Sequence, residues 1–540
     1  MTQLTLANLQ AKKNEFVAMG IKVPSYDVEK VRKTTKENPT WLHFGGGNLF
    51  RAYHAVLQQR LIEQGETDRG IIVVSTIDDG LIEHIYHPHD NLSLNVTFYA
   101  DGSHDMEIIA SVTESIQYFQ NGDSLARLQE IFRNPSLQLV TLTITEKGYK
   151  IHDVNGNLLK HVLHDIEENK ERPQHTMVLL TSLLYERYKI GGAPLALVST
   201  DNFARNGDVL RETIVEIATI WNKKGIVEDG FLDYITSPEK ITYPWSMIDK
   251  ITPHPSAVVS RFLKEKGFAS ADLLEVKKGA SPIAAFTNTE EAEYLVIEDQ
   301  FPNGRPPLEK AGVYLTTKEV VNKVERMKVC TCLNPLHTAL AIFGCLLGYK
   351  SIAEEMKDPD LKQLIMKIAF QESMKVVADP GIINPQDFIN EVIEVRFPNP
   401  NIPDTPQRIA TDTSQKLPIR FGETIKLYRE REDLQVDELR YIPFVFAGWC
   451  RYLMGIDDEG KSMTLSPDPL LEDLQKHIGK IEFGHPESVQ DHLRPILANE
   501  KIFGVNLYDS SLGKKVENYL EQMIQGPGAV RKKLQQLVNE

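Results

Sequence analysis

The stretch HFGGGNLFRAYHA, residues 43–55, decides how the first half of this chain is expected to fold. It follows a short apolar run, TWLHF (40–44), and opens a helix. Gly45 and Gly47 form a G-x-G pair at the junction, where a Rossmann turn needs backbone without Cβ to approach a pyrophosphate at the helix N-terminus. Phe50 stands where the third glycine of that motif would be. The motif alone leaves two interpretations open, a dinucleotide site and a plain strand-to-helix turn.

Further apolar runs repeat the strand-then-helix order along the first half of the chain. They are GIIVVSTID (70–78), LQLVTLTIT (137–145) and PLALVST (194–200). Strands rich in Val, Ile and Leu that alternate with helical patterns predict βαβ units and a parallel sheet covered on both faces. The predicted fold class is α/β, with a Rossmann-type domain at the N-terminus.

The second of these strands ends in acidic residues. Asp78 can bind both ribose hydroxyls of NAD and would repel the 2′-phosphate of NADP. The sequence therefore favours NAD as the cofactor. The alternative interpretation is that Asp78, Asp79 and Gly80 simply form a turn.

The composition turns to proline and glycine at FPNGRPPLEKAG (301–312), which marks a domain boundary or linker. Helical periodicity dominates beyond it, in residues 318–328, 338–350, 361–378 and 517–525. We expect an NAD-binding domain over 1–305 and a mainly helical substrate domain over 306–540, whose last segment could pack back on the first domain. The proline-rich segment 396–408 interrupts the helices and predicts an ordered loop.

The totals agree with a soluble globular protein of two domains. The 540 residues exceed the roughly 250–300 at which single cores stop growing. Lys+Arg 60 against Asp+Glu 75 gives a net charge of −15, which disfavours nucleic acid and anionic membranes as partners. We expect neither a secretory signal nor an apolar run long enough to cross a bilayer. Four cysteines are too few for a disulfide framework, so the predicted location is the cytoplasm.

LNPLH (333–337) combines a helix-start signal with two polar side chains. Asn334 is a favourable cap, and Pro335 fits the first helical position. His337 then lies in the first turn, and Lys328 precedes the helix. Taken alone, these residues fit helix capping plus a partly buried histidine at least as well as they fit an active site.

The spacing of Lys328, Asn334 and His337 resembles the catalytic signature of the long-chain polyol-specific dehydrogenases, the family of mannitol 2-dehydrogenase, fructuronate reductase and tagaturonate reductase. Other segments of similar sequence follow in the family's order. They are GGGNLFRAYHA (45–55), TEKGY (145–149), STDNFARNG (199–207), MIDKITP (247–253) and RFPNPNIPDTPQRIATDTSQKLP (396–418). The resemblance covers nearly the whole chain. The motifs taken together are therefore specific for this family, although no single motif would be.

The chain departs from the family pattern at two points. Five residues separate Lys328 from Asn334, where family members have four. Either a bulge absorbs the extra residue or another amine, with Lys323 the poorer candidate, takes the place of Lys328. Lys250 also stands where the family usually has arginine.

The resemblance implies metal-independent hydride transfer between a nicotinamide and a secondary alcohol carbon. It assigns Lys328 as general base for oxidation and general acid for reduction, and His337 as the group that orients it. Asn334 and an asparagine of the first domain would donate to the developing alkoxide. Asn202, at a predicted strand end, is favoured over Asn206 for that second donor.

The remaining expected site residues bind the substrate and the cofactor or tune the proton equilibrium. Asp249 would act electrostatically, unless it only pairs with Lys250 or another cation. The resemblance places substrate contacts at Arg408, Lys416 and Arg420. Cations in this segment suit a sugar acid, with Arg408 the best candidate. The expected cofactor contacts are Gly45, Gly47, Asn48, Phe50 and Arg51 in the glycine turn and Asp78 at the end of the second strand.

The favoured reaction is reduction of fructuronate to mannonate. Tagaturonate to altronate comes next, and mannitol to fructose third. Two rivals belong to other classes of protein. A non-catalytic NAD-binding sensor would keep the glycine turn and dispense with the proton-transfer residues. The histidines of HIYHPHD (84–90) suggest a metal site, but Pro88 breaks any shared helical face, so we expect no metal.

Overall fold

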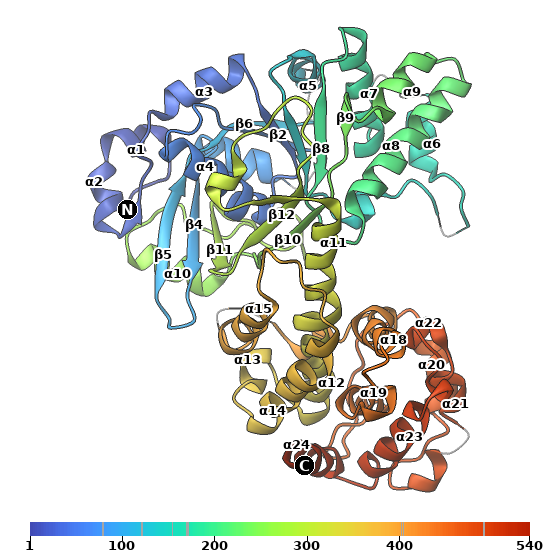
Figure 1. The fold of residues 1–540 in the computed structure, drawn as a ribbon. Helices are drawn as coiled ribbons and strands as arrows, with labels where there is room; N and C mark the ends of the chain where they lie inside the picture. Colours follow the sequence, from blue (N-terminus) through green and yellow to red (C-terminus); the bar gives the residue numbers. More distant parts are fainter. Residues whose placement is uncertain are drawn as a thin grey trace. The chain divides into compact units, whose positions relative to one another are not determined.

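The computed structural model describes residues 1–77, 80–119, 123–153, 155–168, 172–400, 402, 404–489 and 492–540 (Figure 1). The chain divides into two compact units, Met1–Val321 and Asn322–Glu540. The sequence predicts a boundary between residues 305 and 306, whereas the units divide within helix α11 (Lys318–Arg326).

Unit 1 is built around a six-stranded parallel sheet with the strand order β6-β3-β2-β7-β8-β9. Its strands are β2 (Trp41–Phe44), β3 (Ile71–Ser75), β6 (Val112–Gln117), β7 (Leu139–Leu142), β8 (Leu195–Ser199) and β9 (Ile241–Thr242). Numbered from β2 as the first strand, this is the 3-2-1-4-5-6 order of a Rossmann fold, with the order reversing between β2 and β7. The predicted parallel sheet is confirmed.

The helices of unit 1 include α1 (Leu6–Ala11), α2 (Lys13–Ala18), α3 (Val28–Glu37), the π-helical turn η1 (Phe50–His54), α4 (Ala55–Glu63), α5 (Asp123–Arg133), α6 (Lys160–Glu167), α7 (Thr176–Lys189), α8 (Asn206–Lys223), α9 (Asp229–Thr236) and α10 (Ala257–Glu265). Helices α5 to α9 pack on one face of this sheet, and η1 and α4 pack on the other. Helices α1, α2 and α10 belong to a separate core of unit 1.

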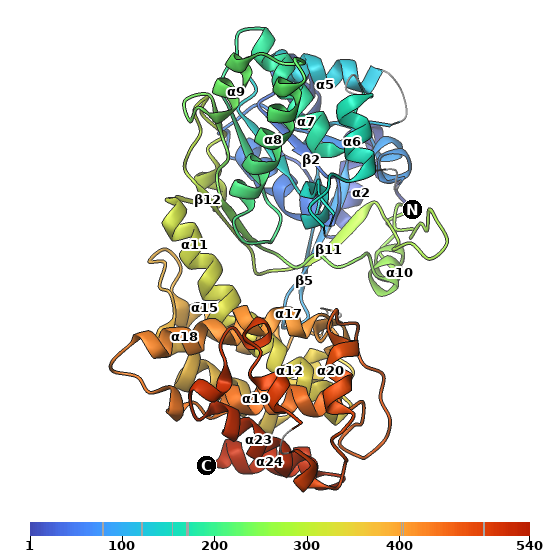
Figure 2. The same ribbon diagram turned by 90° about the vertical axis from the view of Figure 1, so that its right-hand side faces the viewer.

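Alternate residues of β2 enter two different cores, because successive side chains of a strand point to opposite faces. Leu42 and Phe44 join the core formed with α5, α6, α7 and α8. Trp41 joins the core formed with η1 and α4. Figure 2 looks onto α6, α7 and α8, which cover the first of these faces.

Two smaller sheets extend unit 1, and the sequence analysis did not foresee them. One has the order β1-β5-β4-β11 and the other β10-β12-β13. Their strands are β1 (Ile21–Lys22), β4 (Ser93–Phe98), β5 (His104–Ile109), β11 (Phe286–Glu290), β10 (Ser246–Asp249), β12 (Tyr294–Glu298) and β13 (Tyr314–Thr316). Strand β10 ends at Asp249, one of the predicted site residues.

All named elements that lie wholly within unit 2 are helices, as the sequence predicts for this part of the chain. The α-helices are α12 (Asn334–Leu347), α13 (Ile352–Glu355), α14 (Pro359–Lys367), α15 (Pro385–Glu391), α16 (Pro406–Ile409), α17 (Thr413–Leu417), α18 (Glu423–Glu430), α19 (Tyr441–Tyr452), α20 (Leu471–Ile478), α21 (Arg494–Leu497), α22 (Glu500–Phe503), α23 (Leu512–Met523) and α24 (Ala529–Asn539). The π-helical turns are η6 (Met327–Cys332), η7 (Ile368–Glu372), η9 (Val392–Arg396) and η10 (Pro418–Gly422).

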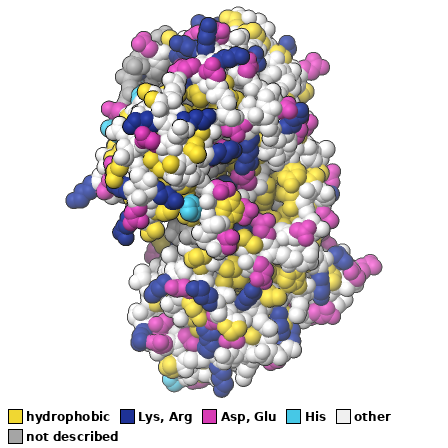
Figure 3. Space-filling view, turned by 90° about the vertical axis from the view of Figure 1, so that its left-hand side faces the viewer, with side chains coloured by type: hydrophobic (Ala, Val, Ile, Leu, Met, Phe, Trp, Pro, Cys, Tyr) yellow, Lys and Arg dark blue, Asp and Glu magenta, His cyan; other side chains and the backbone are white. Residues whose placement is uncertain are grey.

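Among the described residues, one helical run, Lys318–Leu347, is long and apolar enough by composition to cross a membrane. The sequence analysis expected no such run. Its most apolar window is 83% buried inside the protein, which is the pattern of a core helix. On the face drawn in Figure 3, acidic, basic and apolar side chains are intermixed.

Candidate active site

The turn between β2 and η1 depends on its first glycine. Gly45 has φ +109°, and a Cβ atom there would lie 2.1 Å from the carbonyl oxygen of Thr143. Thr143 follows β7, which pairs with β2 at the point where the strand order reverses. A Cβ at Gly47, by contrast, would have nothing within 4 Å. The turn is therefore closed against β7 at Gly45 and open at Gly47, as a cradle for a pyrophosphate requires.

The next residues of the motif support this turn from inside the unit. The Asn48 amide donates to the carbonyl of Pro253 (3.2 Å), and its oxygen accepts from Arg51 (2.8 Å). Arg51 also donates to the carbonyl of Ala284 (2.7 Å) and is buried. Phe50 is fully buried and stacks on the ring of His43. The side chains of Phe50 and Arg51 thus lie in the interior, and Asp78 lies outside the described residues.

The two asparagines that follow β8 have different environments. Asn206 is 1% exposed, and its amide nitrogen donates to backbone oxygens of Ser199, Asp201 and Ser246. Its amide oxygen accepts from the backbone N–H of Ser246 (3.1 Å). Asn206 therefore ties the end of β8 to β10. Asn202 is exposed in the loop beyond β8.

Asp201 is a residue of this region that the sequence analysis missed. Its carboxylate accepts the backbone N–H groups of Ile144 and Thr145 (2.9 Å each) and the hydroxyl of Tyr149 (2.7 Å). Burial raises the pKa of Asp201, and these hydrogen bonds oppose the shift. The acidic position inside S-T-D-N, with TEKGY ahead of it, was the available signal. Asp201 joins the loops that follow β7 and β8.

Asp249 is the last residue of β10 and is 5% exposed. The neighbouring Lys250 donates to Glu293 (2.6 Å) and to the carbonyl of Glu290 (2.9 Å). These two hydrogen bonds of the Lys250 ammonium therefore go to Glu290 and Glu293 and not to Asp249.

In unit 2, Lys328 lies in the π-helical turn η6 and is 4% exposed. The backbone N–H of Leu333 donates to the carbonyl of Lys328 (3.1 Å), five residues back. A π-turn holds one residue more than an α-helical turn. It is thus a bulge of the kind that could absorb the extra residue between Lys328 and Asn334. Lys323 lies one turn earlier, in α11.

Glu325 is a second residue that the sequence analysis missed. It lies three residues before Lys328, a spacing that places two side chains on one side of a helix. Burial raises the pKa of Glu325, and the charges of Lys328 and Arg326 oppose the shift. The E-x-x-K spacing was the available signal.

Helix α12 begins at Asn334, as LNPLH predicts, but Leu333 occupies the cap position. The predicted capping by the Asn334 side chain is wrong, because Leu333, with the non-helical angles φ −120° and ψ −61°, is the N-cap residue and makes no side-chain cap hydrogen bond. The side chain of His337 is 14% exposed, with Nε2 3.2 Å from a carboxylate oxygen of Asp404. Its ring lies 5.1 Å from that of Phe397.

Four cations act on His337. Burial and the charges of Arg420, Arg408, Arg396 and Lys416 lower the pKa of His337 to about 3, so the imidazole is neutral at physiological pH. Arg408 shares the Asp404 carboxylate with His337, Arg420 donates to the neighbouring Thr338, and the charge of Lys416 also acts on the imidazole.

These cations differ in how they are held. Arg420 donates to the hydroxyl of Thr338 (2.5 Å), and burial lowers its pKa to about 10. Lys416 donates to the carbonyls of Ile409 and Thr411, and burial together with the charge of Arg420 lowers its pKa to about 8. Arg408 pairs with Asp404, and its side chain is 64% exposed. The unit therefore concentrates positive charge beside a neutral imidazole.

Comparison with known sequences identifies the class of protein. Residues 39–310 match the mannitol dehydrogenase Rossmann domain, and residues 320–524 match the mannitol dehydrogenase C-terminal domain. The chain belongs to the mannitol dehydrogenase family.

Individual members of the family differ in how similar they are to this chain. The chain is 55% identical to a D-mannonate oxidoreductase of Thermotoga maritima over 522 residues, 96% of each chain. It is 32% identical to a mannitol 2-dehydrogenase of Aspergillus clavatus, over 84% of this chain and 85% of that one. Among solved structures, it resembles the Pseudomonas fluorescens mannitol 2-dehydrogenase complex with NAD and D-mannitol. That match has a TM-score of 0.71 and 25% identity and covers 100% of both chains.

Proposed function

We propose that this protein is an NAD-dependent oxidoreductase that interconverts D-fructuronate and D-mannonate without a metal. The observation that carries the proposal is the basic group beside His337: Arg408 pairs with Asp404, which lies 3.2 Å from His337, and Arg420 donates to Thr338, the next residue in the chain. A sugar acid brings a carboxylate, and clustered arginine and lysine side chains are the groups that bind one. The name of the Thermotoga maritima relative, D-mannonate oxidoreductase, contains one of these two compounds.

The glycine turn fits the pyrophosphate of NAD. Gly45 makes the turn possible, and the open space over Gly47 admits a ligand close to the backbone. Asn48 and Arg51 hold the start of the helix in place. NADH, when bound, supplies the hydride that reduces the keto carbon. The preference for NAD over NADP rests on Asp78 and stays a prediction.

In this proposal the Lys328 amine is the group that donates or accepts the proton of the reaction. As an ammonium it gives a proton to the keto oxygen during reduction, and as a free amine it accepts the hydroxyl proton during oxidation. Glu325 lies three residues before Lys328; burial raises the pKa of the Glu325 carboxyl, and the charge of Lys328 opposes that rise. Asp249 would tune this equilibrium from unit 1.

Amide donors stabilise the alkoxide that develops on the substrate. Asn334 starts α12, and Asn202 is exposed beyond β8, whereas Asn206 is fully used in tying β8 to β10. We therefore keep Asn202 as the donor of unit 1. His337, neutral and packed against Phe397, would accept or donate one hydrogen bond to orient the reacting hydroxyl.

Recognition of the carboxylate falls to Arg408, Lys416 and Arg420. Arg408 is the most exposed of the three and can turn from Asp404 towards a ligand. Arg420 is anchored through Thr338 and supplies a fixed charge. The cytoplasmic location belongs to this proposal too: all four cysteines are described, buried and free, which suits a reducing compartment.

A spectrophotometric panel tests the proposal. Fructuronate, tagaturonate and fructose are each offered with NADH and with NADPH, and the loss of absorbance of the reduced cofactor is followed. We expect the highest kcat/KM with fructuronate and NADH. A higher value with tagaturonate or fructose would make the protein a tagaturonate reductase or a mannitol 2-dehydrogenase. NADH binding without turnover of any of the three would indicate a sensor.

A further inference from the structure

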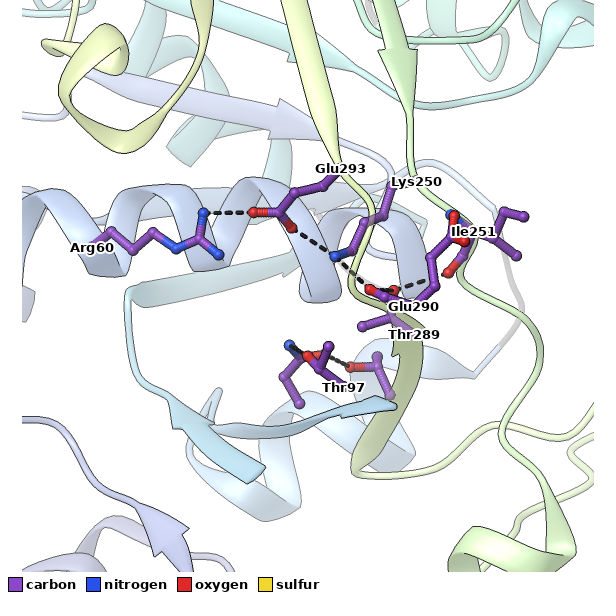
Figure 4. Close-up of polar contacts among 9 residues, drawn as sticks. Arg60, Thr97, Lys250, Ile251, Thr289, Glu290 and Glu293 are labelled. Atoms are coloured by element: carbon purple, nitrogen blue, oxygen red, sulfur yellow. Dashed lines mark hydrogen bonds and ion pairs between the residues drawn. The ribbon is translucent and has the colours of Figure 1, made fainter. Parts of the chain in front are cut away.

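The segment that follows Asp249 is anchored by a buried lysine. The side chain of Lys250 is only 3% exposed. Its ammonium donates to a carboxylate oxygen of Glu293 (2.6 Å) and to the backbone carbonyl of Glu290 (2.9 Å), as Figure 4 shows. A buried ammonium is costly unless it is paired, so these contacts fix where the side chain must lie.

Glu293 is shared between two cations. Its other carboxylate oxygen lies 2.6 Å from Arg60 of α4 (Figure 4). Burial alone would raise the pKa of Glu293, but the charges of Lys250 and Arg60 outweigh it and lower that pKa. The carboxylate is therefore ionised, and it ties the residue after β10 to α4.

The backbone after Lys250 is held from the side of β11. The N–H of Ile251 donates to the Glu290 carboxylate (3.1 Å), and the hydroxyl of Thr289 donates to the carbonyl of Ile251 (2.9 Å). Further on, the carbonyl of Pro253 accepts from Asn48 of the glycine turn (3.2 Å). The strand end and the cofactor turn thus belong to one hydrogen-bonded frame.

The buried phenol of Tyr53 lies within this frame. Burial raises the pKa of Tyr53 well above its ordinary value, and the charges of Glu293 and Asp249 both add to the rise. The ammonium of Lys250 lies 5.9 Å from the centre of the Tyr53 ring. Lys250 directly follows Asp249 in the chain, so the bonds that hold the Lys250 ammonium and the Ile251 N–H fix the backbone on the C-terminal side of Asp249.

We propose that Lys250 is a positioning residue: paired with Glu293 and held at Glu290, it fixes the orientation of Asp249 for the proton step. The inference rests on the proposed function, because it uses the role assigned there to Asp249. Lys250 itself is not assigned a contact with substrate or cofactor. Its removal should reduce turnover only through Asp249.

The test compares Lys250→Met, Lys250→Arg, Asp249→Asn and the double variant Lys250→Met/Asp249→Asn. Methionine keeps the unbranched stem, and Glu293 retains Arg60 as its partner, so we expect Lys250→Met to fold. Misplacing a reacting group by about 1 Å costs on the order of 10²-fold. We expect kcat with fructuronate and NADH to fall about 10–100-fold in Lys250→Met, with NADH affinity unchanged. Lys250→Arg should restore most of that loss.

The double variant separates positioning from general damage. If Lys250 acts through Asp249, Lys250→Met costs nothing further in the Asp249→Asn background, and its pH profile of kcat resembles that of Asp249→Asn. A full, multiplicative loss in the double variant would overturn the proposal, as would wild-type kcat in Lys250→Met. Should Lys250→Met fail to fold, Glu293→Gln takes its place in the same cycle, and the same two results support or overturn the proposal.

A matched control is Lys310→Met. Lys310 is also a lysine of unit 1 paired with a glutamate, Glu66, at 2.8 Å, but its side chain is 52% exposed. Its kcat should equal that of the wild type. Failure of the proposed function is seen separately, because wild-type protein would then not turn over fructuronate with NADH at all.

Discussion

Replacing Gly45 by alanine should break the turn between β2 and η1, whereas Gly47→Ala should leave the fold intact. At Gly45 the added methyl group meets the Thr143 carbonyl oxygen at 2.1 Å, and the backbone has φ +109°. A left-handed conformation costs an L-residue roughly 1–2 kcal/mol, and overpacking adds about 1–3 kcal/mol. The clash is with backbone, so little of it can relax. We expect a total loss of about 3 kcal/mol or more.

The same methyl group at Gly47 meets nothing within 4 Å and needs no positive φ. Stability should therefore change by less than about 0.5 kcal/mol. If the open space over Gly47 receives the pyrophosphate, the methyl group instead obstructs the cofactor. We expect NADH affinity to fall at least about 10-fold, which corresponds to roughly 1.4 kcal/mol.

Thermal unfolding and NADH fluorescence titration separate the two effects. Gly45→Ala should lower Tm by several degrees, since about 3 kcal/mol in a large domain corresponds to roughly 6–12 °C. Gly47→Ala should keep the wild-type Tm and show the weaker NADH binding. A normal Tm for Gly45→Ala would refute the steric argument, and normal NADH affinity for Gly47→Ala would move the cofactor away from this turn.

Three further predictions concern unit 2. Lys328→Ala should lower kcat at least about 10²-fold with little change in NADH affinity, since general acid–base groups contribute about 10²–10⁴-fold; wild-type turnover would mean that another amine acts. Arg408→Met should raise KM for fructuronate about 10–100-fold and leave activity on fructose unchanged, because only the first carries a carboxylate; equal effects on both would refute the assignment. Glu355 is fully buried, and both its carboxylate oxygens lack a hydrogen-bond partner among the described residues. Burial raises the pKa of Glu355 to about 9. The folded protein therefore favours the protonated carboxyl, so its contribution to stability is present at low pH and is lost as the pH rises towards 9. Glu355→Gln should therefore flatten the fall of Tm between about pH 6 and pH 9, and an unchanged slope would contradict this linkage.

The central sheet could be predicted because its strands are recognisable from local sequence. Ile71–Ser75 and Leu195–Ser199 are almost entirely apolar and buried on both faces, so no alternation is needed to recognise them. The two smaller sheets could not be predicted in this way. Phe286 pairs with Leu94, almost two hundred residues earlier in the chain, and β11 carries the polar sequence FTNTE. Its strand character comes from pairing in the folded unit, which local periodicity does not report.

For the site, sequence patterns identified side chains but not their environments. The neutrality of His337 follows from burial and from four cations on separate helical segments, which no spacing rule brings together. The interior positions of Phe50 and Arg51 likewise depend on packing against His43 and Ala284. The family resemblance identified these residues in the sequence. Only the folded structure distinguishes a buried side chain that supports the turn from an exposed one that a ligand could contact.

The π-turn η6 shows how a one-residue departure can leave a site intact. In an uninterrupted α-helix an added residue turns everything beyond it by about 100°, which would move Asn334 and His337 away from Lys328. A π-turn closes its hydrogen bond over one more residue, as the Leu333 to Lys328 bond does here, and so takes up the insertion within a single turn. Two hydroxyl groups donate to backbone carbonyls of this turn: Thr331 to Met327, and Thr424 to Cys330. These bonds supply hydrogen-bond donors to buried carbonyl groups in the irregular turn. The π-turn is thus compatible with the extra residue, and Lys328 stays the predicted amine.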